Sequence, residues 1–357
     1  TCYNASTSFT APSTVNYGDE ITLYAQWDNA YVLTFVNTAL SSNNTTTKNV
    51  LVGQSTPVSP TTSWTRDGYA IAGWDTATNN GSDTVGTIAY RDNQVITPSA
   101  DMTLYTVWRS NTILDYGSTV NAKLKMIANN SSSFDNGSID TMIKAIRRAT
   151  ELPTGFTATY NNTISSYASS AHPVYIFFDN TNNDGIMYYY TDAGIISAHP
   201  SSACMFMHMS SLSDISGLSD WNTSNVTNMV DMFLGDSSLS DLSGIANWDT
   251  HSVTNMAEMF MHTAIEDVNA LRTGGPNGDQ PNVWNTSAVT IMGNLFYDAS
   301  SLSDLSAIAN WDVSKVTATA STNYFYQMFY NVPSRANFVF TNRPGSVNND
   351  GTYVPNE

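Results

Sequence analysis

The chain has 357 residues, of which 41% are apolar and only 12% are charged, and its formal net charge is −17. A chain of this length exceeds one comfortable hydrophobic core, so we expect two or three domains. Its 13 lysine and arginine residues cannot supply the basic field that binding to nucleic acid or to anionic lipid requires. No run of 18 apolar residues occurs, so we expect no direct membrane insertion.

Ser, Thr, Asn and Gln make up most of the remaining residues, and such a surface favours an extracellular, cell-surface location. Cys2 and Cys204 are far apart and form no metal-binding spacing, so we expect free or buried thiols, with one long-range disulfide as the alternative. We find no signal peptide, and a start at Thr1 indicates a mature form or a fragment of a longer protein.

The first part of the chain repeats short aromatic and β-branched runs that predict β-strands. Residues 21–27 (Ile-Thr-Leu-Tyr-Ala-Gln-Trp) return at 102–108 as Met-Thr-Leu-Tyr-Thr-Val-Trp, and 68–74 read Gly-Tyr-Ala-Ile-Ala-Gly-Trp. This order of strand, aromatic turn and closing strand resembles the internalin-type (Listeria–Bacteroides) B-repeat. The resemblance implies small β-rich stalk modules of surface proteins, with a complete copy at 29–109 and the C-terminal part of another at 1–28.

Residues 110–200 have a different pattern, which predicts an α+β segment. Apolar spacing indicates helices over 120–130 and 139–150, and two aromatic runs at 174–178 and 186–190 flank a polar turn, which predicts a β-hairpin. A stack of repeats needs a cover for its first unit, so we expect this segment to be an N-terminal cap.

From about residue 201 to 340 the sequence repeats with a period of 27 residues, lengthened once to 36. The apolar kernel L-x-x-L at this period indicates a leucine-rich-repeat solenoid of about four units, with 341–357 as a tail or linker. The phrase Trp-Asn-Thr-Ser-Asn-Val-Thr-Asn-Met at 221–229 recurs at 248–256 and 284–292 with few changes. It resembles the unit of BspA-like leucine-rich-repeat bacterial surface proteins, a family in which this region implies binding to host matrix proteins or neighbouring cells.

Aromatic residues recur in register with the repeat. A side chain kept in every unit is what the core of a stack requires, so we interpret these columns as structural core and keep carbohydrate stacking as the alternative. The columns are Trp221, Trp248, Trp284 and Trp311, and Phe206, Phe233, Phe260 and Phe296.

An aspartate column lies within the apolar kernel. Local hydrogen bonding to backbone turns is the simpler interpretation, and a ladder of bound calcium ions is the alternative. The column consists of Asp214, Asp241, Asp267 and Asp304.

Residues that break the repeat are the candidates for ligand binding. The lengthened unit contains an insertion at 272–281, and insertions into a repeat array often lie on the binding face. Tyrosine and arginine frequently dominate interface energies. The candidate binding residues are Arg272, Asn277, Asp279, Tyr297, Tyr324 and Tyr326.

No catalytic motif and no cofactor motif is present, so we expect no enzyme and no cofactor. The sequence predicts a bacterial cell-surface adhesin whose partner is a protein or cell-surface ligand. A second hypothesis is a structural subunit that binds copies of itself in a surface filament or layer, and a third is a glycan-active enzyme.

Overall fold

The computed structural model describes residues 29–38, 44–61, 63–77, 88–133, 135, 137–165, 172–275, 278–280, 282–317 and 324–356. We call 29–109 the β-module, 110–200 the cap and 201–340 the coil stack. The strands are β1 Ala30–Asn37, β2 Asn44–Leu51, β3 Thr56–Pro57, β4 Tyr69–Asp75, β5 Val95–Ile96, β6 Met102–Ile113, β7 Ala145–Arg148, β8 Tyr175–Asp179, β9 Ile186–Tyr190, β10 Ile195–Ser197, β11 Trp221–Asn222, β12 Gly345–Val347 and β13 Tyr353–Pro355. The α-helix is α1 Gly117–Ala128.

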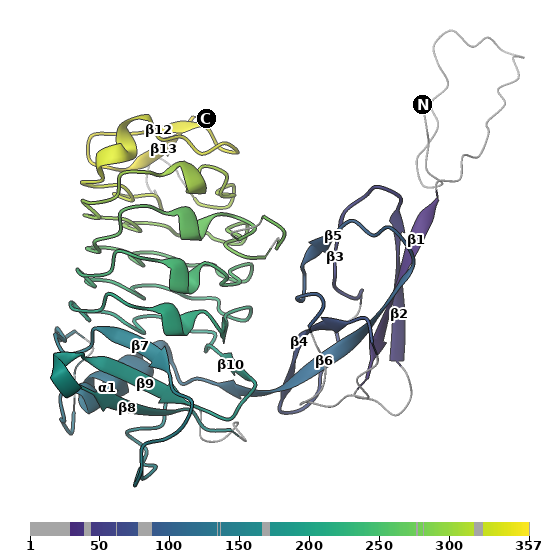
Figure 1. Ribbon diagram of the computed structural model, residues 1–357. Coiled ribbons are helices and arrows are strands. Elements are labelled where there is room, and N and C mark those ends of the chain that lie inside the picture. Colours follow the sequence, from purple (N-terminus) through teal and green to yellow (C-terminus); the bar gives the residue numbers. More distant parts are fainter. Residues whose placement is uncertain are drawn as a thin grey trace, which may run out of the picture.

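Strand β6 belongs to two parts of the molecule at once. Its first half pairs with β1 in parallel and with β4 in antiparallel orientation, inside the β-module. Its last three residues pair in parallel with β10, which pairs in turn with β11 in the first coil. One mixed sheet of order β2-β1-β6-β10-β11, with β4 added on β6, therefore runs from the β-module into the coil stack (Figure 1).

The β-module has a small hydrophobic core of its own. Trp74 is fully buried there and meets the Phe35 ring edge-on, with the ring centroids 5.0 Å apart. A Cβ atom at Gly73 would lie 2.6 Å from the Tyr90 carbonyl. Only glycine therefore fits where the segment around Tyr90 crosses β4. This core is separate from the larger one that the cap and the coil stack share. Residues 1–28, where a partial B-repeat was expected, lie outside the described residues.

The cap consists of α1 packed against a three-stranded sheet of order β7-β9-β8. Strands β8 and β9 form the antiparallel hairpin that the two aromatic runs indicate. The helix expected at 139–150 is wrong, because β7 lies there and pairs in parallel with β9. The Asp140 carboxylate accepts hydrogen bonds from the N–H groups of Met142 and Ile143, and such local side-chain bonding competes with helix formation.

Consecutive coils of the stack lie one on another (Figure 1). Rows of backbone hydrogen bonds join them. In one row, phenylalanine N–H groups donate to carbonyls of the next coil, at distances of 2.9–3.0 Å: Phe206 to Met232, Phe233 to Met259, Phe260 to Leu295 and Phe296 to Met328. The cap continues this pattern, because Ile146 N–H donates to the Asp214 carbonyl of the first coil. The first coil therefore has its backbone groups satisfied by the cap.

The predicted leucine-rich-repeat solenoid is wrong. A leucine-rich repeat places an L-x-L alternation on a β-strand in each unit, whereas the described residues of the coil stack contain only one two-residue strand, β11, besides isolated bridges. The apolar kernel residues are spaced by three, which is the period of a 3₁₀ helix. Each coil accordingly turns through a short 3₁₀ helix: η2 Ser216–Leu218, η3 Ser243–Ile245, η4 Asn269–Leu271 and η5 Ser306–Ile308.

Aromatic side chains fill the centre of the stack. The phenylalanine rings lie nearly parallel, with centroids 5.3–6.1 Å apart from one coil to the next along the column that starts at Phe206. Phe206, Phe233, Phe260 and Phe296 are fully buried, and the tryptophans are 0–5% exposed. The indole N–H groups of Trp248, Trp284 and Trp311 each donate to the last residue's carbonyl in the 3₁₀ helix of the preceding coil, at 2.8–3.1 Å.

The C-terminal segment covers the last coil. Residues 341–357 were expected to be a tail or linker, but the antiparallel strands β12 and β13 form there. Tyr353 of β13 is fully buried against the Phe325 and Phe340 rings, and its hydroxyl donates to the Arg343 carbonyl at 2.8 Å. The apolar end that an open stack would expose is thereby covered.

Replacement of Trp248 by alanine tests the central packing. We expect Trp248→Ala to lower the free energy of unfolding by about 3–5 kcal/mol, because the substitution leaves a cavity and orphans the Leu218 carbonyl. Chemical denaturation measures the change, and Tyr326→Ala, at a position 53% exposed on the last coil, serves as the control with an expected change below about 0.5 kcal/mol. Equal effects of the two substitutions would contradict the packing described.

Candidate functional site

A groove of about 1140 Å³ separates the β-module from the coil stack. One wall consists of β4 and the loop 88–94 of the β-module. The other consists of the turns 219–225 and 247–252 of successive coils, together with Gln280, Asn282 and Val283. Arg109 of β6 and Ile195 of β10 lie between the two walls. Pockets at the junction of separately cored units are common ligand sites.

Strand β6 holds the two walls at a fixed separation. The strand passes without a break from the β-module core to β10, so the walls are linked by paired backbone rather than by a free linker. Close to this link, a Cβ atom at Gly194 would lie 2.9 Å from the Arg109 Cβ. Glycine at this position lets the Arg109 side chain lie flat against the entry to β10.

The stack wall is built from one repeated turn. At the start of the turn, an Asn or Asp side chain accepts the backbone N–H two residues later. This hydrogen bond fixes the turn, whose polar groups face the groove. The Asn222 side chain accepts the Ser224 N–H at 3.1 Å, and the Asp249 carboxylate accepts the His251 N–H at 3.1 Å. All four residues line the groove. The later coils repeat the bond at Asn285 and Asp312.

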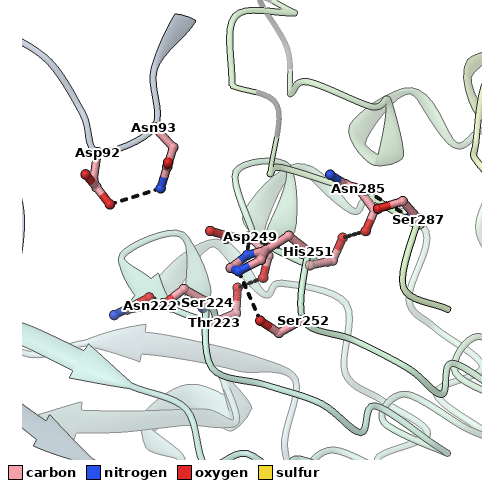
Figure 2. A network of polar contacts seen from close by, with 11 residues as sticks. Asp92, Asn93, Asn222, Thr223, Ser224, Asp249, His251, Ser252, Asn285 and Ser287 are labelled. Carbon is pink, nitrogen blue, oxygen red and sulfur yellow. Dashed lines mark hydrogen bonds and ion pairs between the residues drawn. The ribbon is translucent and has the colours of Figure 1, made fainter. Parts of the chain in front are cut away.

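His251 is the residue that departs from this repeated turn, because serine occupies its position in the neighbouring coils. Its Nδ1 atom lies 2.6 Å from Asp249 Oδ1, and its Nε2 atom lies 3.1 Å from Ser252 Oγ (Figure 2). The hydrogen bond to Asp249 raises the pKa of His251 above its ordinary value, against the opposing effect of burial. The imidazole is therefore held on the groove wall by contacts from both of its ring nitrogens.

Asp92 belongs to the opposite wall (Figure 2). Its carboxylate accepts the Trp74 indole N–H at 2.9 Å and the Asn93 amide at 3.0 Å. Although part of the residue is open to the groove, the surrounding protein desolvates the carboxylate, and this raises its pKa. The negative charge of Asp249 adds to the increase, whereas the Trp74 hydrogen bond opposes it.

Charges in the groove balance, although the whole chain is strongly acidic. Three arginines and three aspartates line it, namely Arg91, Arg109 and Arg148, and Asp92, Asp220 and Asp249. Arg148 donates to the Ala193 carbonyl at 3.1 Å and lies 3.9 Å from Asp220. The groove thus offers a locally neutral, hydrogen-bonding surface.

The insertion at 272–281 contacts the β-module. The Val95 N–H of β5 donates to the Asp279 carbonyl at 2.5 Å, so the loop forms a second link between the walls, beyond β6. Within the loop, Gln280 N–H donates to the Gly274 carbonyl at 3.2 Å. Arg272 is exposed at the base of the loop, and Asn277 lies outside the described residues.

The candidate tyrosines lie apart from the insertion, on the last coils. Tyr297 stacks on Tyr330 with ring centroids 4.5 Å apart, and it meets His262 edge-on. Tyr324 and Tyr326 are 38% and 53% exposed. None of these tyrosines lines the groove, so the structure does not bring the candidate binding residues together.

The aspartate column caps the 3₁₀ helices. Asp214, Asp241, Asp267 and Asp304 each accept the backbone N–H two residues later, at 2.8–2.9 Å. Arg147 also donates two hydrogen bonds to Asp214. Within the described ranges, no group of three or more His, Cys, Asp or Glu side chains is placed to hold a metal ion. The local hydrogen bonding therefore accounts for these carboxylates.

Sequence reasoning missed the groove because its walls come from distant segments. Asp92 and Asp249, on opposite walls, are separated by more than 150 positions, and nothing in either local pattern predicts that they face one groove. The signal that the sequence did carry was His251, a single substitution within an otherwise regular repeat.

Comparison with known proteins assigns similarity to part of the coil stack only. Residues 201–334 match a family model described as a Mycoplasma protein of unknown function, DUF285. No curated protein and no solved structure matches the chain. Across the part of the chain that the structure describes, no helix has the length and apolar character needed to cross a membrane.

Shortening the insertion tests its role as a link. Excision of residues 275–279 joins Gly274 to Gln280, whose backbone atoms already lie within hydrogen-bond distance. We expect faster hydrogen exchange at the Val95 amide, which loses its acceptor, and a larger radius of gyration in X-ray scattering. Arg272→Ala, at the exposed base of the loop, is the control, and unchanged exchange at Val95 in the shortened protein would rule out the link.

In the coil stack, the pKa of Asp231 lies in an experimentally accessible range. Asp231 and Glu258 occupy equivalent positions in adjacent coils, both with left-handed backbone conformations. Burial, followed by the charge of Glu258, raises the pKa of Asp231 to about 6. Because the folded protein binds this proton more tightly than the unfolded chain, the associated stability is present at low pH. It is lost as pH rises from about 4 through 6.

Replacement of Asp231 by asparagine removes this titration. We expect Asp231→Asn to raise the stability at pH 7.5 by roughly 1 kcal/mol, because it removes a half-buried charge that solvent screens only in part. Asparagine also tolerates the left-handed backbone. Thermal melts at pH 5.0 and 7.5 should differ less for the variant than for the parent, and Asp241→Asn, an exposed capping position, should leave the difference unchanged.

Proposed function

We propose that this protein is a non-catalytic bacterial cell-surface adhesin that holds an extended segment of a host matrix protein, or of a neighbouring cell's surface protein, in the groove. The observation that carries the proposal is the amide lining of the groove. Seven amide side chains from both walls and from the base of the insertion contribute: Asn93, Gln94, Asn222, Asn225, Asn247, Gln280 and Asn282.

An amide side chain carries the same kinds of hydrogen-bonding group as a peptide bond, namely a carbonyl acceptor and N–H donors. A wall of such groups can therefore pair with both the N–H and the C=O groups of an extended backbone. Turns anchored at Asn222 and Asp249 recur from coil to coil, so the polar groups repeat along the stack wall. Such a row of polar groups along one wall suits an elongated ligand, such as an extended polypeptide, better than a compact one.

The electrostatics of the groove support the same class of ligand. The balanced charges of the lining favour a ligand with little net charge, and the strongly acidic remainder of the chain repels polyanions. An extracellular location is consistent with the low charged fraction and the hydroxyl- and amide-rich composition. The likeness of the repeat phrase to BspA-like surface proteins points in the same direction.

A bulky side chain in the groove tests the proposal. Ser224 lines the groove, and Ser314 occupies the equivalent turn of the last complete coil, outside the lining. We expect Ser224→Trp to weaken binding at least tenfold, because the indole fills space that the ligand needs, whereas Ser314→Trp leaves binding unchanged. The measurement is surface plasmon resonance against immobilised collagen, fibronectin, fibrinogen and laminin.

Two results would overturn the proposal. Binding that Ser224→Trp and Ser314→Trp reduce equally would place the ligand elsewhere. Absence of binding to the four proteins, together with concentration-dependent assembly in sedimentation experiments, would favour the self-associating structural subunit instead.

A glycan-active enzyme is the second candidate, favoured by the carboxylates of Asp92 and Asp249 on facing walls. Glycoside hydrolysis needs one carboxyl group with a raised pKa and a second that stays ionised. Asp249, however, has a structural explanation, because it anchors the turn that the other coils repeat with Asn222 and Asn285. Release of nitrophenol from nitrophenyl glycosides that Asp92→Asn abolishes would establish this alternative.

A further inference from the structure

A second cavity lies in the cap, and none of its lining residues lines the groove. It has a volume of about 490 Å³ and is formed where the start of α1 meets the segment 160–165. Asp115 N–H donates to the Ile164 carbonyl and Leu114 bridges to Ser165, so the two sides of the cavity are held together by backbone pairing. Ser165 and Thr163 are themselves buried. The volume lies within the size range of small-ligand pockets.

The base of this cavity is a neutral ion pair. Lys123 is almost fully buried, and its ammonium group donates to Asp115 Oδ2 at 2.8 Å and to the Thr163 carbonyl at 2.6 Å. Breaking a buried pair leaves an uncompensated charge, which is costly. A charged ligand that drew either partner away would meet this cost, so the base selects for an uncharged ligand.

Two exposed tyrosines stand at the mouth of the cavity. Tyr160 is 74% exposed, and its ring lies over the Lys123 ammonium with the nitrogen 4.1 Å from the ring centroid. Tyr116 is 59% exposed, and its ring packs against the His199 imidazole with centroids 3.9 Å apart. Each ring is positioned by a defined contact while most of its surface stays in water. The two rings therefore leave apolar ring surface open beside the cavity, a feature that many small-ligand pockets share.

We propose that the cap cavity binds a single neutral sugar ring. The C–H groups of a sugar face can pack on the Tyr116 and Tyr160 rings, whose faces are negatively polarised. Its hydroxyl groups can bind the hydroxyl of Thr119, which lines the cavity, and the edge of the Asp115 carboxylate that faces away from Lys123. Neutrality of the ion pair, the two aromatic rings and the hydroxyl lining together match an uncharged polyhydroxylated ring.

The test uses the full chain and defined monosaccharide probes. Saturation-transfer NMR and isothermal titration are performed with the methyl glycosides of glucose, galactose and mannose, with N-acetylglucosamine, and with sialic acid as a charged comparison. We expect at least one neutral probe to bind with Kd near 1 mM and sialic acid not to bind. Tyr160→Ala should weaken that binding at least tenfold, and Tyr160→Phe, which keeps the ring, should retain it. Tyr326→Ala, an exposed tyrosine of the last coil, is the matched control and should have no effect.

Tyr160→Ala also removes the ring that lies over the Lys123 ammonium, so its thermal melt is measured beside its binding. Tyr160→Phe keeps this contact, and its retained binding separates loss of the sugar platform from loss of stability. The proposal is overturned if no neutral probe binds, or if Tyr160→Ala and Tyr326→Ala have the same effect. It is also overturned if N-acetyltyrosinamide binds there and no sugar does, since the cavity would then receive a peptide side chain.

Discussion

The hydrogen bonds between successive coils are the constraint on which the structure depends. Each coil donates alternate backbone N–H groups to the next one, and this fixes the register of every column of side chains. The register requires left-handed backbone at two positions of each coil, for example at Asp231 and at His262. Such a conformation costs energy in residues other than glycine. It persists because the hydrogen bonds on both sides and the stacked phenylalanines beneath it determine the path of the chain.

The groove follows from how this stack is joined to the β-module. β6 satisfies the backbone of β1 and β4 with its first half and that of β10 with its last residues. The insertion then reaches the β-module through Asp279 and Val95. A surface with matched polar walls is thereby formed between two units that have separate cores, without either unit having to be hollow.

The periodic residues are the part of this fold that a sequence can predict. A side chain that recurs in every coil has the same surroundings in each. Its regular spacing therefore predicts that it belongs to the core, as for the buried Trp248. The secondary structure within a coil was harder to predict, because the spacing of three that suggested leucine-rich repeats belongs to turns that lead into short 3₁₀ helices. Residues such as Asp241 fix these turns by accepting a backbone N–H at the start of the helix. The helix expected near Ile139 failed because Asp140 binds its own backbone neighbours. The groove could not be predicted, since it depends on the pairing of Asn111 with Ile195 across the chain.

Continuity of β6 also determines how the molecule carries load. A pull between the β-module and the coil stack is transmitted along this strand, and its parallel partners β1 and β10 lie alongside it rather than at its end. Separation then shears several interstrand hydrogen bonds at the same moment instead of opening them one after another. The junction that shapes the groove is consequently one that a pull along β6 would load in shear.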